Sequence, residues 1–271
     1  MKPAQSMSKE EKQDKVFRVF EEIAKGYDRA NVRISLGMQD AWKRMLIREI
    51  TGEGAGRRAC RQAGRKAADS HSGRMRVLDL CTGTGDIALG IAGAGTKYDV
   101  TGMDFSPSML RVAASKAKKR GLSGIRWRRG NAMRIPCGDA YFDAVSISFG
   151  LRNCADPEQV LRESFRVLRP GGRFLCLDSF VPESAVVRPF YRLYFGSIMP
   201  LLGGGTAHRS EYEWLQESTE RFWGPSELAD RMRAAGFERI LVRRRMMGAC
   251  VLLVGHKPQG CSPKKTLNKV L

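Results

Sequence analysis

The sequence predicts an α/β fold, a doubly wound Rossmann-like sheet of seven strands that is mostly parallel and has an antiparallel last strand. Two observations carry this prediction. An apolar strand at residues 77–80 contains an acid and ends in a glycine-rich turn that opens a helix. Strand-like and helix-like segments then alternate at βαβ spacing as far as residue 180, which is typical of a parallel sheet with helices on both faces.

The first turn has the sequence Cys81-Thr-Gly83-Thr84-Gly85 and follows the strand that contains Asp79. Glycine is needed in such a turn because a side chain would hold the backbone away from a ligand, and because a sharp turn from strand to helix often needs a positive φ angle. Two glycines alone are weak evidence, since many strand-to-helix turns carry them for steric reasons. The elements that follow therefore decide whether this turn binds a nucleotide.

The second strand, at residues 98–104, also ends in an acid. The carboxylate of Asp104 can accept hydrogen bonds from both hydroxyl groups of a ribose. A helix is predicted directly after it, because Ser106 is a good N-cap residue and Pro107 suits the first helical position.

The third strand, at residues 125–129, leads into the polar turn Gly130-Asn131-Ala132. This turn lies where the edge of an adenine ring can be recognised. The remaining elements follow from apolar runs bounded by turn signals. They are a buried strand at 142–148, a helix that begins after Asp156 and stops at 169–172, a fifth strand at 173–180, a helix after Pro225, and a closing pair of strands at 238–243 and 249–256.

These residues, in this order, resemble the class I S-adenosylmethionine-dependent methyltransferases, whose cofactor lies across the carboxyl ends of the first, second and fourth strands. The rival interpretation is a nicotinamide dinucleotide fold, because residues 83–88 also fit G-x-G-x-x-A and Asp104 suits either ribose. Three habits of methyltransferases argue against it. They are Asp79 before the glycine turn, the turn at residues 130–132, and Pro170-Gly-Gly172 before the fifth strand.

Two further stretches carry a narrower resemblance. They are the amino-terminal signature at residues 19–44 and the motif Ser148-Phe-Gly-Leu-Arg-Asn153. Both look like the ubiquinone/menaquinone biosynthesis C-methyltransferases, and the similarity covers residues 16–257 apart from one insertion. Chance rarely preserves several spaced motifs in order. Smaller matches are Tyr194-Phe, Met199-Pro-Leu-Leu, Arg209, Tyr212 and Gln216-Glu-Ser218.

The resemblance implies transfer of a methyl group from S-adenosylmethionine to a ring carbon of a prenylated reduced quinone. The Cys-Thr-Gly-Thr-Gly-Asp form of the turn at residues 81–86 looks more like members of the menaquinone pathway, so demethylmenaquinol is the expected acceptor. Alternatives are a benzoquinol of the ubiquinone pathway, another small molecule or RNA as acceptor, an NAD-dependent oxidoreductase, and a catalytically silent binding module. Because the methyl group is already activated, positioning and exclusion of water should dominate catalysis.

The same resemblance implies roles for individual residues. Arg152 and Asn153 are the catalytic candidates, for a cation near the developing phenolate and for a group that accepts or relays the hydroxyl proton, with Tyr27 and His208 as outside candidates. Bland alternatives exist, since Asn131 can simply form an Asx turn and Arg152 a surface ion pair. The expected cofactor contacts are Asp79, Gly83, Thr84, Gly85, Asp104, Asn131, Ala132 and Ser148.

The chain divides into four parts by composition and motif. They are an N-terminal helical cap at residues 1–50, a basic flexible insertion at 51–76, the methyltransferase domain at 77–257 with a lid insertion at about 182–224, and a disordered basic tail at 258–271. Besides the insertion and the tail, the chain departs from the family's pattern at His208, where an acid is usual, and at Asp178, which stands in place of glutamate. These two departures concern the acceptor site.

Composition excludes several classes of protein. Residues 1–12 lack the apolar core of a signal peptide, and no apolar run approaches the ~20 residues needed to span a bilayer. The seven cysteines include no C-x-x-C pair and have no histidine-rich neighbourhood. We therefore expect reduced thiols in a cytoplasmic protein, and no metal site.

The net charge of +19 gathers in four stretches, at residues 51–76, 111–129, 243–245 and 257–271. Such clusters suit either phosphate backbones or the anionic inner leaflet of a membrane. A prenylated substrate favours peripheral association with the inner face of the cytoplasmic membrane. Nucleic acid is disfavoured as a partner, because the sequence has no RNA-binding module and no paired catalytic cysteines for pyrimidine methylation. The oligomeric state stays open, and a homo-oligomer is compatible with the sequence.

Overall fold

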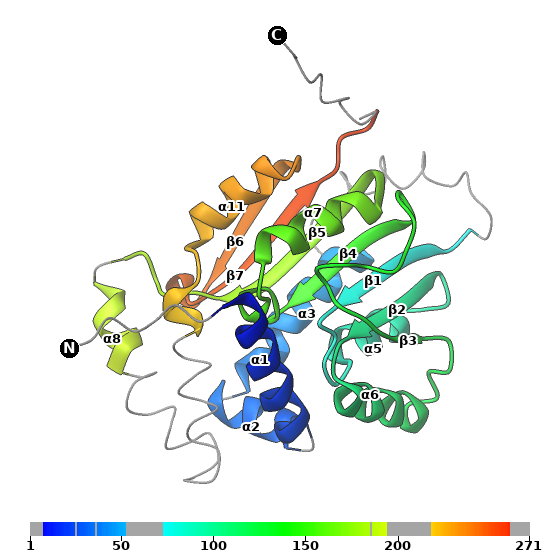
Figure 1. Ribbon diagram of the computed structural model, residues 1–271, viewed down its shortest axis with the longest axis horizontal. Helices are drawn as coiled ribbons and strands as arrows, with labels where there is room; N and C mark the ends of the chain where they lie inside the picture. Colours follow the sequence, from blue (N-terminus) through cyan, green and yellow to red (C-terminus); the bar gives the residue numbers. More distant parts are fainter. Residues whose placement is uncertain are drawn as a thin grey trace.

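The computed structural model of the protein describes residues 8–24, 26–35, 37–52, 73–184, 186–193 and 218–260. A seven-stranded sheet in the order β3-β2-β1-β4-β5-β7-β6 runs through the molecule (Figure 1). β7 is antiparallel to both of its neighbours, and the other pairs are parallel. The predicted fold class is therefore confirmed. The strands are β1 (Met75–Leu80), β2 (Tyr98–Asp104), β3 (Arg126–Arg129), β4 (Phe142–Ser148), β5 (Leu168–Ser179), β6 (Glu238–Arg245) and β7 (Cys250–His256).

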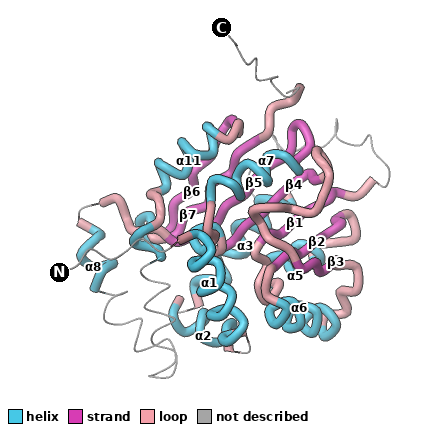
Figure 2. Tube along the Cα trace, viewed as in Figure 1, coloured by secondary structure: helices cyan, strands magenta, loops and turns pink. Residues whose placement is uncertain are grey.

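Helices cover both faces of the sheet (Figure 2). α7 (Pro157–Val167) and α11 (Pro225–Ala234) pack on one face. α3 (Met38–Thr51), α5 (Asp86–Gly93) and α6 (Pro107–Lys119) pack on the other. Two hydrophobic cores therefore enclose the sheet, one on each side.

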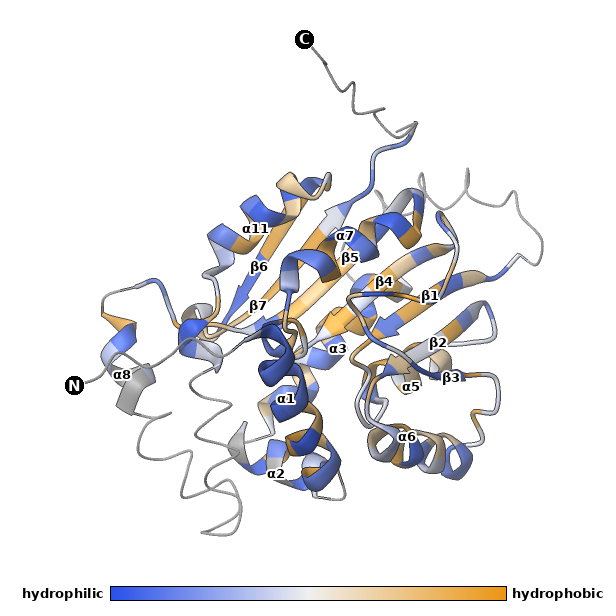
Figure 3. Cartoon of the chain, in the orientation of Figure 1, coloured by the Kyte–Doolittle hydropathy of each residue, from blue (hydrophilic) through white to orange (hydrophobic). Residues whose placement is uncertain are grey.

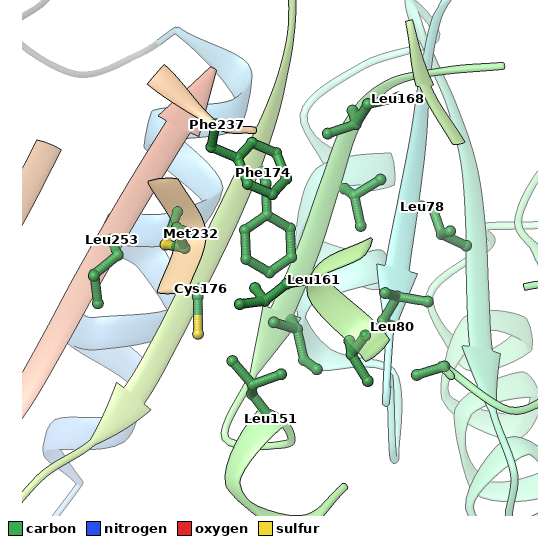
Figure 4. Close-up of a cluster of buried hydrophobic side chains, with 14 of the residues drawn as sticks. Leu78, Leu80, Leu151, Leu161, Leu168, Phe174, Cys176, Met232, Phe237 and Leu253 are labelled. Atoms are coloured by element: carbon green, nitrogen blue, oxygen red, sulfur yellow. The ribbon is translucent and has the colours of Figure 1, made fainter. Parts of the chain in front are cut away.

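Successive side chains of the strands alternate between these two cores, because they point to opposite faces of the sheet. In β1, Leu78 and Leu80 face α7 and α11, whereas Val77 faces α3 and α5. Phe174 and Phe237 stack in the first core, with ring centroids 5.3 Å apart (Figure 4). The central strands are therefore largely apolar, and Figure 3 shows much of their length in orange.

The predicted helix starts are confirmed. Ser106 Oγ accepts a hydrogen bond from the backbone N–H of Met109 at 3.1 Å, with Pro107 at the start of α6. Asp156 Oδ1 accepts from the backbone N–H of Gln159 at 2.9 Å at the start of α7. Each cap satisfies a backbone donor that has no partner inside its helix.

One strand boundary differs from the prediction. β5 begins at Leu168, five residues before the predicted start, because Leu168 pairs with Phe142 across a register shift in β4 and β5. Gly171 adopts a φ of +76° within this irregular stretch. The Pro-Gly-Gly signal therefore marks a break inside the strand rather than a loop before it.

Within the predicted helical cap, the segment that precedes α3 forms two helices at the carboxyl edge of the sheet. α1 (Lys9–Ile23) and α2 (Tyr27–Ile34) are separated by a short break. The Glu21 carboxylate of α1 accepts hydrogen bonds from Ser106 Oγ at 2.6 Å and Ser108 Oγ at 2.6 Å. These bonds attach α1 to the beginning of α6.

Several predicted parts fall outside the described residues. They include residues 53–72 of the basic insertion, residues 194–217 of the predicted lid, and residues 261–271 of the carboxyl-terminal tail. The ends of the predicted insertion belong to neighbouring elements instead, since α3 ends at Thr51 and β1 begins at Met75. The other described elements are the short helix η1 (Leu151–Asn153), α8 (Val187–Leu193) and the short helix η4 (Met246–Gly248). Within the described part of the chain, no helix is long and apolar enough to cross a membrane.

Replacement of Leu253 by alanine should lower the free energy of unfolding by about 2–5 kcal/mol, because its fully buried side chain leaves a cavity between β7 and α11. The matched control is Leu241→Ala on edge strand β6, where the side chain is 41 % exposed. This control should change stability by less than about 0.5 kcal/mol. Urea titrations measure both values, and equal losses would contradict the placement of Leu253 in the core.

Candidate cofactor and acceptor site

A cavity lies at the carboxyl ends of β1, β2 and β4, with α1 and the start of α2 forming its outer wall. It holds about 780 Å³ of space between atoms, part of which is open to solvent. A cavity at the ends of parallel strands is the usual ligand position in open α/β sheets. Its wall consists of Gln13, Val16, Phe20, Tyr27, Cys81, Gly83, Met103, Asp104, Phe105, Met109, Gly130, Asn131, Ala132, Met133, Ser148, Phe149, Gly150, Asn153, Cys154 and Ala155.

The two glycines of the turn after β1 have different functions. Gly83 has a φ of +55° and lines the cavity, and a Cβ built on it would meet no atom within 4 Å. A side chain there would therefore project into open space that a ligand can occupy. Gly85 does not line the cavity, because a Cβ there would lie 2.7 Å from the ring of Trp127 and 2.9 Å from Ala113. It allows close packing of α5 against α6 and β3.

Asp104 ends β2 as a buried side chain of the cavity wall. Its Oδ2 accepts a hydrogen bond from the backbone N–H of Gly83 at 2.9 Å, and its Oδ1 accepts from that of Ser106 at 2.9 Å. Burial raises the pKa of Asp104 to about 6, although these hydrogen bonds act in the opposite direction. Each carboxylate oxygen keeps lone pairs that can accept further hydrogen bonds from a ligand.

Asp79 lies behind the cavity wall rather than in it. Its carboxylate accepts hydrogen bonds from Thr82 Oγ1 at 2.6 Å and Ser146 Oγ at 2.8 Å. Burial raises the pKa of Asp79 to about 7. Asp79 therefore connects the glycine turn to β4 through these two hydrogen bonds.

Thr84 is not brought to the cavity. Its hydroxyl donates to Asp28 Oδ1 at 2.6 Å and accepts from Lys116 Nζ at 3.2 Å. Lys116 also pairs with Asp28 at 2.8 Å, and it shares Asp86 with Lys43, which lies 2.6 Å from that carboxylate. This charged network joins α2, α3, α5 and α6 around the turn. Nothing in the sequence spacing pointed to it, because its members come from four separate helices.

Asn131 and Ala132 both line the cavity, in the turn after β3. Asn131 Oδ1 accepts a hydrogen bond from the backbone N–H of Met133 at 2.9 Å, which is an Asx turn. The Asx turn holds the side chain in place at the cavity wall. The two sequence-based interpretations of Asn131 are therefore compatible with each other.

Ser148 and Asn153 present unused hydrogen-bonding atoms at the cavity. Ser148 Oγ and Asn153 Oδ1 are buried and have no hydrogen-bond partner among the described residues. Asn153 Nδ2 donates to the carbonyl oxygen of Phe149 at 3.3 Å, which orients the amide. Buried polar atoms without partners are rare and costly in proteins. These two atoms, together with Gly83 and Asp104, fit a polar ligand.

Arg152 turns away from the cavity wall to form a buried ion pair with Asp178. The side chain of Asp178 has no exposed surface, and burial raises its pKa despite the positive charge of Arg152. The charge also reaches Tyr27 in the cavity wall, where burial raises the phenol pKa while a hydrogen bond with Asn31 and the charge of Arg152 lower it. Arg152 can therefore act on the cavity through its electrostatic potential.

Much of the cavity wall is apolar, and the sequence interpretation missed these residues. Phe20, Phe105 and Phe149 line it, and Phe149 lies 6.2 Å from the ring of Trp42 on α3. Phe105 and Phe149 each directly follow a predicted strand, so their positions gave a usable signal. Cys81 also lines the cavity, and its Sγ lies 4.0 Å from Cys154 Sγ.

His208 lies outside the described residues. Within the described ranges, no group of three or more His, Cys, Asp or Glu side chains is arranged to hold a metal ion.

Comparison with known proteins gives close relatives along nearly the whole chain. The model of the ubiE/COQ5 methyltransferase family matches residues 7–257. The demethylmenaquinone methyltransferase of Anoxybacillus flavithermus is 40 % identical over 251 residues, which cover 92 % of this chain and 98 % of that protein. The enzyme of the same name from Lactiplantibacillus plantarum is 37 % identical over 242 residues, covering 88 % of this chain and 94 % of that protein.

Solved structures share the fold at lower identity. A methyltransferase of Thermotoga maritima, described as SAM-dependent and as a possible histamine N-methyltransferase, has a TM-score of 0.56 at 21 % identity and covers 89 % of this chain and 99 % of its own. The [4+2]-cyclase SpnF has a TM-score of 0.54 at 21 % identity and covers 84 % of this chain and 96 % of its own. These likenesses show the fold alone, because one fold supports different reactions.

Removal of one partner of the Arg152–Asp178 pair should be costly. Arg152→Met is expected to lower the free energy of unfolding by about 3–5 kcal/mol at neutral pH, since it leaves the Asp178 carboxylate buried without its cation. The double variant Arg152→Met/Asp178→Asn removes both charges and should recover most of this loss. Chemical denaturation measures all three proteins. If the single variant is as stable as the parent chain, the pair is not structural.

The raised pKa of Asp104 predicts how ligand affinity depends on pH. The carboxyl is charged above pH 6 and protonated below it, and protonation removes acceptor capacity toward ribose hydroxyls. Affinity for S-adenosylhomocysteine, the demethylated form of the expected cofactor, should therefore fall by up to about tenfold for each pH unit below 6. Isothermal titration calorimetry between pH 5 and pH 8, in steps of about half a pH unit, measures this affinity.

The control for this prediction is Asp104→Asn, which should bind weakly and lose the dependence on pH. Asp79, whose pKa is raised to about 7, remains in this variant. A pH dependence that survives in Asp104→Asn would therefore assign the effect to Asp79 or another group, and not to Asp104.

Proposed function

The chain belongs to the ubiE/COQ5 methyltransferase family, and from this we propose that it transfers a methyl group from S-adenosylmethionine to a ring carbon of a prenylated reduced quinone. The proposed acceptor is demethylmenaquinol. One observation carries the choice of acceptor: relatives 37–40 % identical, matched over nearly the full length of both chains, have the name demethylmenaquinone methyltransferase.

The cofactor site that we propose uses the polar part of the cavity. Asp104 accepts hydrogen bonds from the ribose hydroxyls, and Gly83 leaves room for the ligand against the turn. Asn131 and Ala132 border the adenine, and Ser148 Oγ supplies a hydrogen bond that no described residue satisfies. Asp79 and Thr84 act at one remove, by holding the turn against β4 and α2.

When bound, S-adenosylmethionine supplies a methyl group already activated by its sulfonium, so the protein has to supply position and electrostatics. The acceptor becomes a carbon nucleophile when its ring hydroxyl loses a proton to water. Attack on the methyl group releases S-adenosylhomocysteine, and the methylated ring carbon then loses its own proton to water, which restores the aromatic quinol. In the proposed site, Asn153 Oδ1 accepts a hydrogen bond from that hydroxyl and orients the ring. The positive charge of Arg152, held in place by Asp178, lowers the free energy of the phenolate that forms.

The apolar wall completes the proposed site. Phe20, Phe105, Met109 and Phe149 line the cavity beside the polar atoms described above. Apolar rings bury the quinol ring and exclude water from the reacting atoms, which strengthens the effect of Arg152. Tyr27, whose pKa is raised by burial, stays a neutral phenol near pH 7 and acts as a hydrogen-bond donor in this arrangement.

We propose that the protein acts in the cytoplasm, at the inner face of the cytoplasmic membrane. A prenylated quinol resides in the bilayer, and the net charge of +19 favours an anionic surface. On β3 and α6, Lys118, Lys119, Arg128 and Arg129 have no carboxylate partner within 4 Å among the described side chains. Their charge is therefore free to add to a long-range attraction.

The test is transfer of labelled methyl from S-adenosylmethionine to chemically reduced demethylmenaquinone. A reduced demethylated benzoquinone precursor and bulk RNA serve as parallel acceptors. Label in the naphthoquinol is the expected result. Label only in the benzoquinol would correct the acceptor ring, and label only in RNA, or in none despite cofactor binding, would overturn the proposal.

Asn153→Ala should lower kcat by about 10²-fold or more, because the acceptor hydroxyl loses the group that orients it. Affinity for S-adenosylhomocysteine should stay within about twofold of the parent value, since the amide is assigned to the acceptor. Steady-state kinetics and calorimetry separate the two effects. A variant that loses cofactor affinity instead would move Asn153 to the cofactor site.

A further inference from the structure

The turn between β6 and β7 carries two exposed methionines in an unusual backbone conformation. Met246 has a φ of +47° and Met247 a φ of +52°, and Gly248 follows with a φ of +100°. The side chains are 44 % and 76 % exposed. Consecutive left-handed residues favour Asn, Asp and Gly, so methionine is costly here. Stability of the turn therefore does not explain why methionines occupy it.

A third exposed apolar side chain, Val186, belongs to a segment that runs beside this turn. The chain that leaves β5 runs beside it, since the backbone N–H of Phe180 donates to the carbonyl oxygen of Ala249 at 3.0 Å. Arg244 then pairs with Glu183 at 3.4 Å. Val186 follows three residues later and is 76 % exposed. Two segments distant in sequence thus contribute exposed apolar side chains to this part of the surface.

Positive charge surrounds these apolar tips. Arg243 and Arg244 form ion pairs, with Glu49 and Glu183. Arg245 donates to the carbonyl oxygen of Arg244 at 3.0 Å, and Arg188 donates to carbonyl oxygens at 3.2 and 3.4 Å. Neither of these two guanidinium groups has a carboxylate partner within 4 Å among the described residues. An excess of positive charge therefore remains around the methionines.

The position of the turn in the fold relates it to the cavity. β6 is antiparallel to β7, which is antiparallel to β5, so β6 runs in the same direction as β1, β4 and β5. The turn after β6 accordingly lies at the carboxyl edge of the sheet (Figure 1). The residues that line the cavity lie at the same edge. A partner that binds this turn therefore lies on the same side of the protein as the cavity proposed for the acceptor.

We propose that Met246, Met247 and Val186, with Arg188 and Arg245 beside them, form a docking surface for an anionic lipid bilayer. The apolar tips enter the boundary between head groups and acyl chains, and the guanidinium groups bind lipid phosphates. This inference deepens the proposed function and rests on it. Docking on a bilayer brings the protein to its acceptor only if that acceptor is a prenylated quinol held in the bilayer. It identifies which face of the protein meets the lipid.

The test is co-sedimentation with vesicles of phosphatidylcholine alone and of phosphatidylcholine mixed with phosphatidylglycerol. The key variant is Met246→Asn/Met247→Gly, which keeps the turn and places favoured residues at its left-handed positions. Its Tm should equal or exceed that of the parent protein, so that a misfolded variant is recognised. Its partition onto mixed vesicles should fall about tenfold or more.

Two further variants make the test specific. Arg188→Gln/Arg245→Gln should remove most of the preference for mixed over phosphatidylcholine vesicles. The matched control is Tyr141→Ser, which removes a side chain 39 % exposed just before β4, at the opposite edge of the sheet. This control should bind mixed vesicles as the parent does. Equal loss in the control and in the turn variant would overturn the proposal.

Docking and methyl transfer can fail separately. Vesicle binding needs no acceptor, so loss of binding in the turn variant supports docking even if demethylmenaquinol is never methylated. Conversely, parent-like binding by the turn variant overturns docking while leaving methyl transfer intact. Size-exclusion chromatography tests whether a second copy of the chain binds this surface instead of lipid. If the turn variant changes only the oligomeric state, the surface binds a second copy of the chain and the lipid proposal is wrong.

Discussion

The buried carboxylate of Asp104 is the interaction on which the site depends. It accepts one hydrogen bond from Gly83 in the turn after β1 and one from Ser106 at the start of α6. Two backbone segments that come from different βα units are thereby held at one edge of the sheet. In this position the carboxylate is removed from water, and this desolvation raises its pKa to about 6. The group that shapes the cavity is thus also a group that a polar ligand can stabilise further.

The outer wall of the cavity is attached mainly by polar contacts. Glu21 of α1 accepts hydrogen bonds from Ser106 and Ser108, and Lys12 donates to the carbonyl oxygen of Cys154 at 2.7 Å. Burial lowers the pKa of Lys12. Among the described residues, α1 also packs on α6 through a small apolar cluster, and Phe17 lies 5.7 Å from the ring of Phe105. A wall held in this way contrasts with the sheet, whose two cores bury whole strands, and it places the weaker packing at the edge where ligands enter.

Charge in this protein has two separate structural roles. In the network of Lys43, Lys116, Asp28 and Asp86, opposite charges are paired inside the fold and position helices around the glycine turn. On the surface of the described part, Lys118, Lys119, Arg128 and Arg129 have no carboxylate partner within 4 Å. The Arg152 guanidinium belongs to neither extreme, because it is paired with Asp178 and still influences the cavity. Counting charges along the chain does not distinguish these roles, since pairing depends on side chains brought together from separate elements.

The sequence by itself determined the strands, their order of polar endings and the turns at the sheet edge, because alternation of apolar residues and the demands of Gly83 and Asp104 are local properties. The tertiary structure alone decided where the side chains of Thr84 and Arg152 point. The long side chain of Arg152 and the rotatable hydroxyl of Thr84 can each turn toward the cavity or toward a neighbouring element. Their partners, Asp28 and Asp178, lie 56 and 26 residues away, so only the folded arrangement decided the direction.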